Sequence, residues 1–353
     1  MKIFLILGLL ISSCSSTKTA RTSFTKDIDK VLSSRKAPPF SGVVIVERDN
    51  KRIYESVQGE GVTLDSKMLI GTVSKEITAA MILKAVEQGK LRLTDKVHTH
   101  LPEYDGWARN VTIHHLLTHS SGLQDGAGKP VGKIGQRFHY SNRNYNLLGK
   151  ILERASLRPF GEQLRELTKI CGLDHTLAPE SGTLSFFKKL YPEYMIGKQE
   201  VGGVLKNTPQ EYFSMDDPSS GIVSSASDLI AWHKCLWGGM YLTPQSLTLM
   251  TKPQVQKTVD EETVGYAYGL QYTKNIWLEE YSQTGSIPGY TSSLLYYPQS
   301  KTTVVIMENV SLDPNNPDRA FSLHESVRSE VIEELLETEF GKYEVDMKNT
   351  LTK

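Results

Sequence analysis

Strand patterns lie at the two ends of this chain, and a long, mostly helical stretch separates them. Near the start, residues 42–47 and 52–57 flank the polar turn 48–51, which predicts a β-hairpin. Because an isolated hairpin is only marginally stable, we expect it to join later strands in one sheet. Comparable strand patterns return at residues 266–272, 278–283, 291–297 and 302–307.

This order of elements predicts an α/β fold with a helical insertion. We assign the sheet-bearing subdomain to residues 41–100 and 260–342, and the inserted helical subdomain to residues 101–259. The cleft between two such subdomains is the default place for a ligand.

The most apolar helix is predicted to begin at Thr72 and to end at Gly89, which suits a left-handed helix cap. Its apolar residues share one face and mark it as a central, buried helix. Further helices are predicted from near Ser23 and over residues 114–119, 142–155, 226–237 and 320–340.

Thr72 and Lys75 stand at the start of this central helix, and together they could form a nucleophile. Residues three apart lie on the same face of a helix, so the Thr72 hydroxyl and the Lys75 amine can come into contact. Burial would shift the Lys75 amine toward its neutral form, which can take the hydroxyl proton. The unpaired N–H groups and the positive dipole at the helix start would also stabilise an oxyanion.

Taken alone, a Thr and a Lys at this spacing usually mark a helix cap and a solvated side chain. Two further segments, Tyr140-Ser141-Asn142 and Gln283-Thr284-Gly285-Ser286, follow in the order that a catalytic site would need. They too have ordinary alternatives, since Tyr140 could be a half-buried aromatic residue and Asn142 a turn former. The three segments together form the candidate site.

Residues 1–13 carry the features of an export signal: a positive charge, a short apolar run and small residues after it. The apolar run is too short to span a bilayer. Because the segment ends at Cys14 in a sequence that resembles a bacterial lipobox, we expect cleavage before Cys14 and lipidation of its thiol. Residues 14–40 would then hold a tether and the first helix. An ordinary signal peptide with an incidental cysteine is the alternative.

Two classes of binding site are not expected. The chain carries 40 basic and 40 acidic side chains, so its charge gives no support for nucleic-acid binding. The histidines at 114, 115 and 119 suggest a zinc site at first sight, but no Glu or Cys stands at ligand spacing.

Cys171 and Cys235 remain after Cys14. The residues that flank each of them look like buried core segments, so we expect two buried free thiols. A disulfide is the alternative that an exported chain would allow.

Five segments of the chain resemble, in order, the motifs of the serine beta-lactamase and penicillin-binding-protein superfamily, in its class C and D,D-peptidase-like branch. This resemblance implies the beta-lactamase/transpeptidase-like fold, an antiparallel sheet flanked by helices with a helical inserted subdomain. The segments are residues 70–75, 112–123, 140–142, 220–225 and 283–290.

The resemblance also implies acyl transfer through a covalent ester. Thr72 would attack a carbonyl carbon, and Lys75 and Tyr140 would carry the proton. The backbone N–H groups of residues 72 and 286 would hold the oxyanion. The implied substrate-binding and oxyanion residues are Asn142, Gln283, Thr284, Gly285 and Ser286.

The protein implied by this resemblance and by the export signal is an envelope lipoprotein that hydrolyses an ester, an amide or a peptidoglycan-type peptide. It would work without a metal or cofactor, as a monomer that touches the membrane only through its lipid. Ser15, rather than Asp, after the lipidated cysteine favours the outer membrane, facing the periplasm. Beta-lactamase, D,D-carboxypeptidase and esterase activity all remain open.

Two positions depart from the family motifs. Thr72 stands where the family has Ser, and its methyl group restricts the rotamer of the hydroxyl. Gln283 stands where the family has Lys or His, which removes a cation that similar enzymes use against a substrate carboxylate. Uncharged esters are therefore expected to be better substrates than penicillins. The alternative is a weak or inactive homologue that binds peptidoglycan peptides or a protein partner.

Overall fold

The computed structural model describes residues 23–104, 106–126, 130–179, 184–208, 217–259, 262–313 and 316–351. The predicted export signal, Cys14 and the first part of the tether lie outside these residues. Within the described part of the chain, no helix is both long and apolar enough to cross a membrane.

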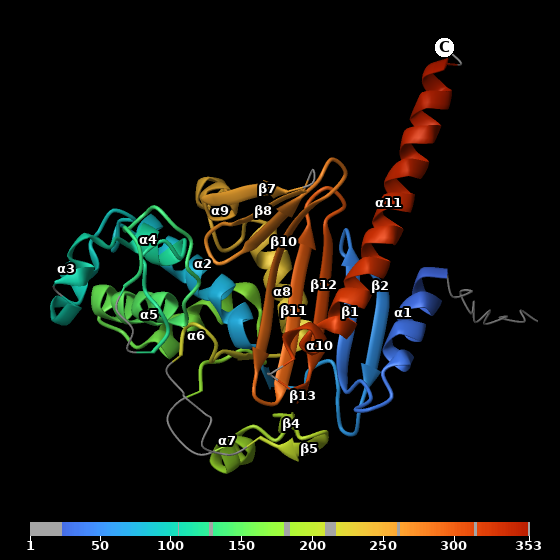
Figure 1. Ribbon diagram of the computed structural model, residues 1–353, viewed down its shortest axis with the longest axis horizontal. Coiled ribbons are helices and arrows are strands. Elements are labelled where there is room, and N and C mark those ends of the chain that lie inside the picture. Colours follow the sequence, from blue (N-terminus) through green and yellow to red (C-terminus); the bar gives the residue numbers. More distant parts are fainter. Residues whose placement is uncertain are drawn as a thin grey trace, which may run out of the picture.

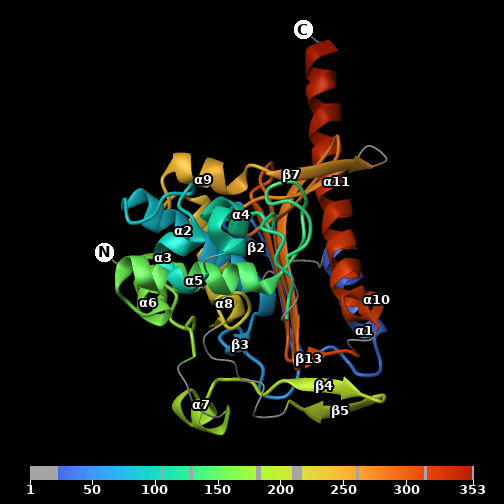
Figure 2. The same cartoon turned by 60° about the vertical axis from the view of Figure 1, so that its left-hand side comes forward.

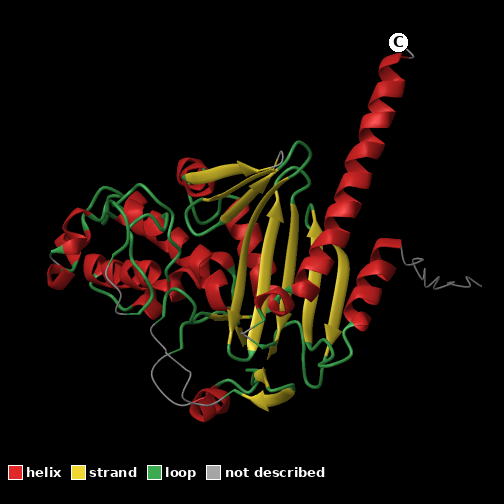
Figure 3. Cartoon of the chain, in the orientation of Figure 1, coloured by secondary structure: helices red, strands yellow, loops and turns green. Residues whose placement is uncertain are grey.

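One antiparallel sheet of eight strands organises the structure, in the order β2-β1-β12-β11-β10-β9-β8-β7 (Figures 1 and 3). The early hairpin pairs with a late strand, from Gly42 opposite Glu308 to Arg48 opposite Thr302. The predicted fold class, with early and late strands in one sheet, is confirmed. The strands are β1 Gly42–Arg48, β2 Lys51–Gln58, β7 Val255–Val259, β8 Glu262–Tyr266, β9 Gln271–Lys274, β10 Glu279–Ile287, β11 Tyr290–Tyr297 and β12 Thr302–Glu308.

The single strand predicted at residues 266–272 is wrong, because β8 ends at Tyr266 and β9 begins at Gln271. The turn between them contains Gly269, whose φ is +75°. A Cβ at Gly269 would lie 2.6 Å from the Lys75 carbonyl oxygen, so the turn packs directly on the central helix. An apolar pattern along the sequence does not reveal a turn that is imposed by packing against a distant helix.

Two terminal helices, α1 (Ser23–Ser34) and α11 (Ser322–Leu351), cover one face of the sheet (Figure 1). The last helix was predicted over residues 320–340. In the structure the short helix α10 (Pro317–Ala320) comes first, and α11 then begins at Ser322 and extends beyond the sheet. The buried contact between these helices and the sheet includes Ile28, Leu32, Val44, Val46, Leu295, Val304, Ile306, Val327 and Val331.

The central helix α2 (Ser74–Glu87) and helix α8 (Ala226–Trp237) pack on the other face of the sheet. All residues of α2 from Ser74 to Leu83 are buried, as predicted for a central helix. Gly89 follows α2 with a φ of +70°, so the predicted left-handed end is confirmed. Helix α8 has the predicted bounds.

The inserted stretch is helical for most of its described length, but it also contributes the short strands β4 (Lys198–Val201), β5 (Val204–Asn207) and β6 (Val223–Ser224), which the sequence did not predict. These strands are too short to show an alternating pattern. They pair with short strands from outside the stretch: β6 with β3 (Met68–Leu69), and β4 with β13 (Val310–Ser311) in a three-stranded sheet with β5 at one end of the molecule (Figure 2). The short helix α3 (Val97–His100) leads into this stretch, whose further helices and 3₁₀ turns are η2 Pro102–Tyr104, η3 Trp107–Asn110, α4 Ile113–Leu117, α5 Asn142–Ser156, α6 Phe160–Cys171, α7 Leu184–Leu190 and α9 Pro244–Thr251.

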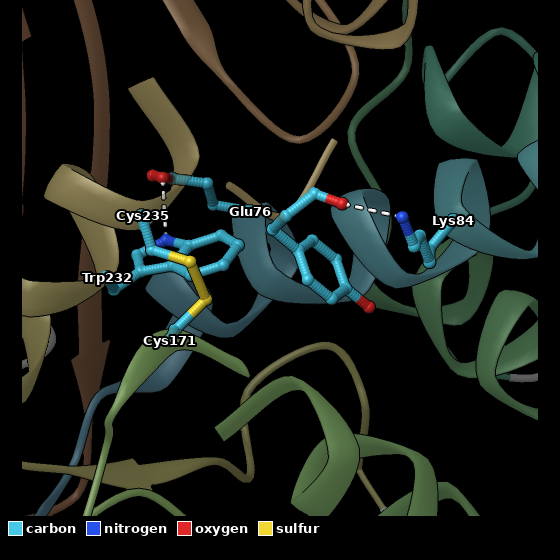
Figure 4. Close-up of a disulfide and its surroundings, with 6 residues drawn as sticks. Glu76, Lys84, Cys171, Trp232 and Cys235 are labelled. Atoms are coloured by element: carbon cyan, nitrogen blue, oxygen red, sulfur yellow. Dashed lines mark hydrogen bonds between the residues drawn. A yellow bond between two sulfur atoms is a disulfide. The ribbon is translucent and has the colours of Figure 1, made fainter. Parts of the chain in front are cut away.

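The prediction of two free thiols is wrong. Cys171, at the end of α6, and Cys235, in α8, form a disulfide with their Cα atoms 5.4 Å apart (Figure 4). Both residues are buried, as expected, but no local pattern along the chain indicates that these two helices meet. The cross-link closes a separation of 64 residues, and loop-entropy arguments assign such a link about 4 kcal/mol of stability.

Candidate active site

Thr72 lies in a 3₁₀ turn, η1 (Gly71–Val73), that leads directly into α2. This turn rests against strand β10 at Gly285. A Cβ added at Gly285 would lie 2.5 Å from the Ile70 carbonyl oxygen and 2.9 Å from the Thr72 nitrogen. Only glycine allows this approach, so Gly285 sets the distance between the strand and the turn that carries Thr72.

The Thr72 hydroxyl is held by two partners from separate parts of the chain. It donates a hydrogen bond to the Thr284 carbonyl oxygen in β10. It is also hydrogen-bonded to the Tyr140 hydroxyl. The structure therefore brings Thr72, Tyr140 and the Gln283–Ser286 segment together, as the sequence predicted.

The Lys75 side chain is fully buried and lies between two oxygen acceptors. Its Nζ donates to the Asn142 side-chain oxygen at 2.7 Å and to the Ser219 backbone oxygen at 3.0 Å. The same nitrogen lies 5.0 Å from the ring centre of Tyr140 and 5.7 Å from that of Tyr145. Ser219 was not predicted as part of the site, because a backbone acceptor carries no signal in the sequence.

Burial lowers the pKa of Lys75 from 10.5 to about 7, although Asp217 and Asp125 act in the opposite direction. A large share of this amine is therefore neutral near pH 7. A neutral amine has two N–H bonds and one lone pair. With both N–H bonds directed at Asn142 and Ser219, the lone pair is left to accept a proton.

Tyr140 has the opposite character, because it keeps its proton. The residue is 37% exposed, but its hydroxyl end reaches into the site. Burial raises the pKa of Tyr140 well above its usual range, and the hydrogen bond with Thr72 only partly opposes this shift. At neutral pH the Tyr140 hydroxyl is therefore a proton donor rather than a base.

His119 lies beneath Tyr140, and the sequence did not predict a place for it in the site. The two ring centres are 4.4 Å apart, and the His119 residue is fully buried. Burial, with the nearby Lys75, lowers the pKa of His119 well below its usual value, so the ring is neutral. Its Nδ1 pairs with the Asn144 amide nitrogen at 2.9 Å, which fixes the ring as a platform for Tyr140.

Asn142 is the first residue of α5, and the loop before this helix is held from the side. The Ser141 hydroxyl donates to Asp125 Oδ1 at 2.7 Å, and the Arg143 backbone N–H reaches the same oxygen at 3.3 Å. Asp125 thereby fixes the residues on both sides of Asn142. This support directs the Asn142 amide oxygen at Lys75.

Gln283 is fully buried, and its side-chain amide is bonded within the protein. Its amide nitrogen donates to the Gly269 carbonyl oxygen at 2.7 Å and to the Tyr266 hydroxyl at 3.1 Å. Its side-chain oxygen has no hydrogen-bond partner among the described residues. Gln283 thus places at this position a neutral amide whose N–H groups are already paired within the protein.

Thr284 and Ser286 are two residues apart in β10, so strand alternation places both on the face opposite to Gln283 and Gly285. Thr284 lines a hollow on the α11 face of the sheet, together with Ser293 and His324. Its backbone carbonyl, rather than its hydroxyl, meets Thr72. Ser286 is exposed, one residue beyond Gly285. Substrate contact by the Thr284 side chain and an oxyanion role for Ser286 stay predictions.

Several polar side chains near the site make hydrogen bonds that stabilise the fold. The Ser74 hydroxyl accepts the Ile222 backbone N–H at 3.1 Å, so it points away from the site. His114 pairs with the Tyr268 hydroxyl at 2.7 Å, and His115 caps the start of α4. Among the described residues, no group of His, Cys, Asp and Glu side chains is arranged to hold a metal ion.

Comparisons with known proteins agree with this geometry. Residues 35–327 match the family described as Beta-lactamase. The protein flp of Staphylococcus aureus (strain MW2) is 26% identical over 282 residues, which cover 70% of this chain and 53% of that protein. The chain therefore spans about half the length of this curated relative.

Solved structures share the fold. A penicillin-binding protein homologue from Pyrococcus abyssi, described as octameric, has a TM-score of 0.70 and 24% identity, over 81% of this chain and 72% of that one. The D-amino acid amidase from Ochrobactrum anthropi SV3 has a TM-score of 0.73 and 17% identity, over 90% of this chain and 99% of that one. Since the family match runs through the sheet and all three segments of the site, the chain belongs to the beta-lactamase family of penicillin-binding-protein-like hydrolases.

Proposed function

We propose that the protein is an acyl hydrolase that forms a covalent ester on Thr72. The observation that carries this proposal is the buried Lys75 amine, whose pKa is lowered to about 7 and whose N–H groups are occupied by Asn142 and Ser219. Both of these acceptors are uncharged oxygens, so neither hydrogen bond holds the amine in its protonated form through a carboxylate. A general base beside a hydroxyl nucleophile requires such an amine.

The reaction begins when the Thr72 hydroxyl leaves the Thr284 carbonyl and gives its proton to Lys75 Nζ. Thr72 Oγ1 then bonds to the substrate carbonyl carbon, and the negative charge moves to the carbonyl oxygen. The backbone N–H groups of residues 72 and 286 hold that oxygen. When the intermediate collapses, the leaving group departs with a proton from Tyr140, which regains one from Lys75. Water then cleaves the Thr72 ester by the same steps.

The preferred substrates are uncharged esters or amides. Gln283 brings no charge into the cleft, and both of its N–H groups are bound to protein oxygens. A substrate carboxylate would lose its hydration without gaining a cation, which is unfavourable. Penicillins and D-Ala-D-Ala peptides carry such a carboxylate, so they are expected to react more slowly.

The proposal includes a location in the bacterial envelope, with the mature chain anchored through a lipid on Cys14 at the outer membrane. The Cys171–Cys235 disulfide supports export, because such bonds persist in oxidising compartments and are rare in the cytosol. The segment that carries the anchor lies outside the described residues.

A second candidate function is ligand binding without turnover. The observation that favours it is the position of the Thr72 hydroxyl, which donates to Thr284 and not toward an incoming carbonyl. A threonine that could not leave this bond would give a cleft that binds peptidoglycan peptides or a protein partner but does not react.

Measuring kcat/KM for a short-chain nitrophenyl ester beside a chromogenic cephalosporin tests the proposal. The ester should be the better substrate, and Lys75→Ala should remove its turnover. Preference for the cephalosporin would contradict the substrate assignment. If neither compound reacts and intact-mass analysis finds no acyl adduct, the binding function replaces the hydrolase.

A further inference from the structure

A groove of about 490 Å³ opens beside the candidate site, and Tyr140 forms part of its wall. This volume falls in the range of small-molecule pockets. Asn142 and Ser219, which hold Lys75, do not line the groove. Tyr140 does line it, and its hydroxyl is also hydrogen-bonded to Thr72. Its apolar and aromatic walls are formed by Phe138, Tyr140, Val255, Val264, Tyr266 and Tyr272.

The walls come from two parts of the chain. The loop before α5 supplies Phe138 and Tyr140, and strands β7, β8 and β9 supply the rest. Val255 lies opposite Tyr266, and Lys257 opposite Val264, so these four side chains share one face of the sheet.

The groove exposes apolar side chains that a closed core would bury. Phe138 is 41% exposed, Val264 is 39% exposed and Tyr140 is 37% exposed. Exposed apolar side chains gathered in one hollow are typical of ligand sites. Lys257 adds a positive charge at the wall, which makes the groove unsuited to a cationic group.

The chemistry proposed for Tyr140 assigns this groove to one part of the substrate. Tyr140 gives its proton to the leaving-group atom, so the leaving group is the part of the substrate nearest to Tyr140. The Tyr140 side chain is also part of the wall of the groove. A chain attached to the leaving-group atom can therefore pass Tyr140 into the groove, whereas the acyl chain starts from the carbon bonded to Thr72.

We propose that this groove binds the leaving group, and that the preferred substrates are esters or amides of bulky, uncharged apolar alcohols or amines. The inference rests on the proposed hydrolase function and adds a substrate class to it. Each methylene that the groove removes from water can contribute up to about fourfold in kcat/KM.

Isomeric esters provide the test, because they differ only in which side of the ester carries the chain. Hexyl acetate and ethyl hexanoate have the same formula, and ethyl acetate is the short reference. For the full-length protein, kcat/KM should rise at least about tenfold from ethyl acetate to hexyl acetate, and clearly less to ethyl hexanoate. Release of acid is followed by pH-stat.

Val264→Asp should remove most of the gain for hexyl acetate, because it places a charge in the wall of the groove. Val57→Asp is the matched control, since Val57 is 38% exposed against 39% for Val264 but lies in β2, away from the site. Its ratio of hexyl acetate to ethyl acetate should equal that of wild type. Phe138→Ala is a second variant, with the same expected loss.

The outcomes separate this inference from the proposed function. If the isomers react equally, or if ethyl hexanoate is preferred, the groove does not take the leaving group and the inference is overturned while the hydrolase remains. An unchanged hexyl preference in both Val264→Asp and Phe138→Ala also overturns it. If no ester reacts at all, the proposed function fails and the leaving-group assignment fails with it.

Discussion

The Lys75 amine donates to the Asn142 side-chain oxygen at 2.7 Å, and this bond joins the first turn of α2 to the first residue of α5. It fixes the amine 5.0 Å from the Tyr140 ring centre and uses one of its N–H bonds. Burial lowers the pKa of Lys75 to about 7, so the neutral form of the amine is populated at neutral pH.

This pKa predicts the pH dependence of the reaction. The neutral amine is the form that can accept the Thr72 proton, so kcat/KM for a neutral ester should rise with pH through about 7 and level off above it. A pH series with a nitrophenyl ester, corrected for spontaneous hydrolysis, measures it. Lys75→Arg keeps its charge at every pH and should stay inactive throughout. A wild-type rate that does not change between pH 6 and pH 8 would show that Lys75 is not the base.

Gly285→Ala should damage both activity and stability. The new Cβ would lie 2.5 Å from the Ile70 carbonyl oxygen, so the turn that carries Thr72 must shift. A displacement of about 1 Å at a nucleophile can cost on the order of a hundredfold in kcat/KM. Gly161→Ala is the control, because the nearest atom to its Cβ is 3.7 Å away. Similar activity in both variants would mean that the close approach at Gly285 does not position Thr72.

The disulfide should stabilise the fold without taking part in the reaction. Reducing it, or replacing both cysteines by Ala, should lower the free energy of unfolding by about 4 kcal/mol. Ester hydrolysis by the folded protein should change little, since the cysteines lie in α6 and α8 and the side chains of the candidate site lie on other elements. Urea unfolding with and without a reductant measures the difference. The double variant is the control, as it should not respond to the reductant; a wild type equally indifferent to reductant would contradict the prediction.

Lipid attachment at Cys14 is tested by its removal. The mature protein should begin at a lipid-bearing Cys14 and partition into detergent, as the lipobox-like sequence before it predicts. Cys14→Ser should abolish both the lipid mass and the detergent partitioning. Processing and membrane attachment that persist unchanged in Cys14→Ser would rule out the anchor.

Much of the fold followed from the sequence where patterns are local. The early hairpin, α8 and the end of α2 at Gly89 were predicted because alternating or helical apolar patterns and a glycine cap mark them directly. The split between β8 and β9 was missed, because Gly269 is required by its contact with the Lys75 backbone. The Cys171–Cys235 bond was missed for the same reason, since it depends on how α6 meets α8.

The candidate site divides in the same way. Thr72, Lys75, Tyr140 and Asn142 stand in recognisable segments, and the structure brings them together. The contacts that give them their chemistry are not visible in the sequence. Ser219 acts through its backbone oxygen, and His119 acts through its position beneath Tyr140.

Thr72 itself provides the most direct test of the central claim, that the site is a working acyl-transfer centre in which the methyl group slows the nucleophile. The measurement is the rate of acylation, followed by intact mass and nitrophenol release, in wild type, Thr72→Ser and Thr72→Ala. Thr72→Ser removes the methyl and leaves Lys75, Tyr140 and Asn142 in place. It should acylate faster by about tenfold, which needs only about 1.4 kcal/mol of barrier, and Thr72→Ala should form no adduct. A folded wild type and a folded Thr72→Ser that both remain unmodified, yet bind a muropeptide, would contradict the account and establish the binding function in its place.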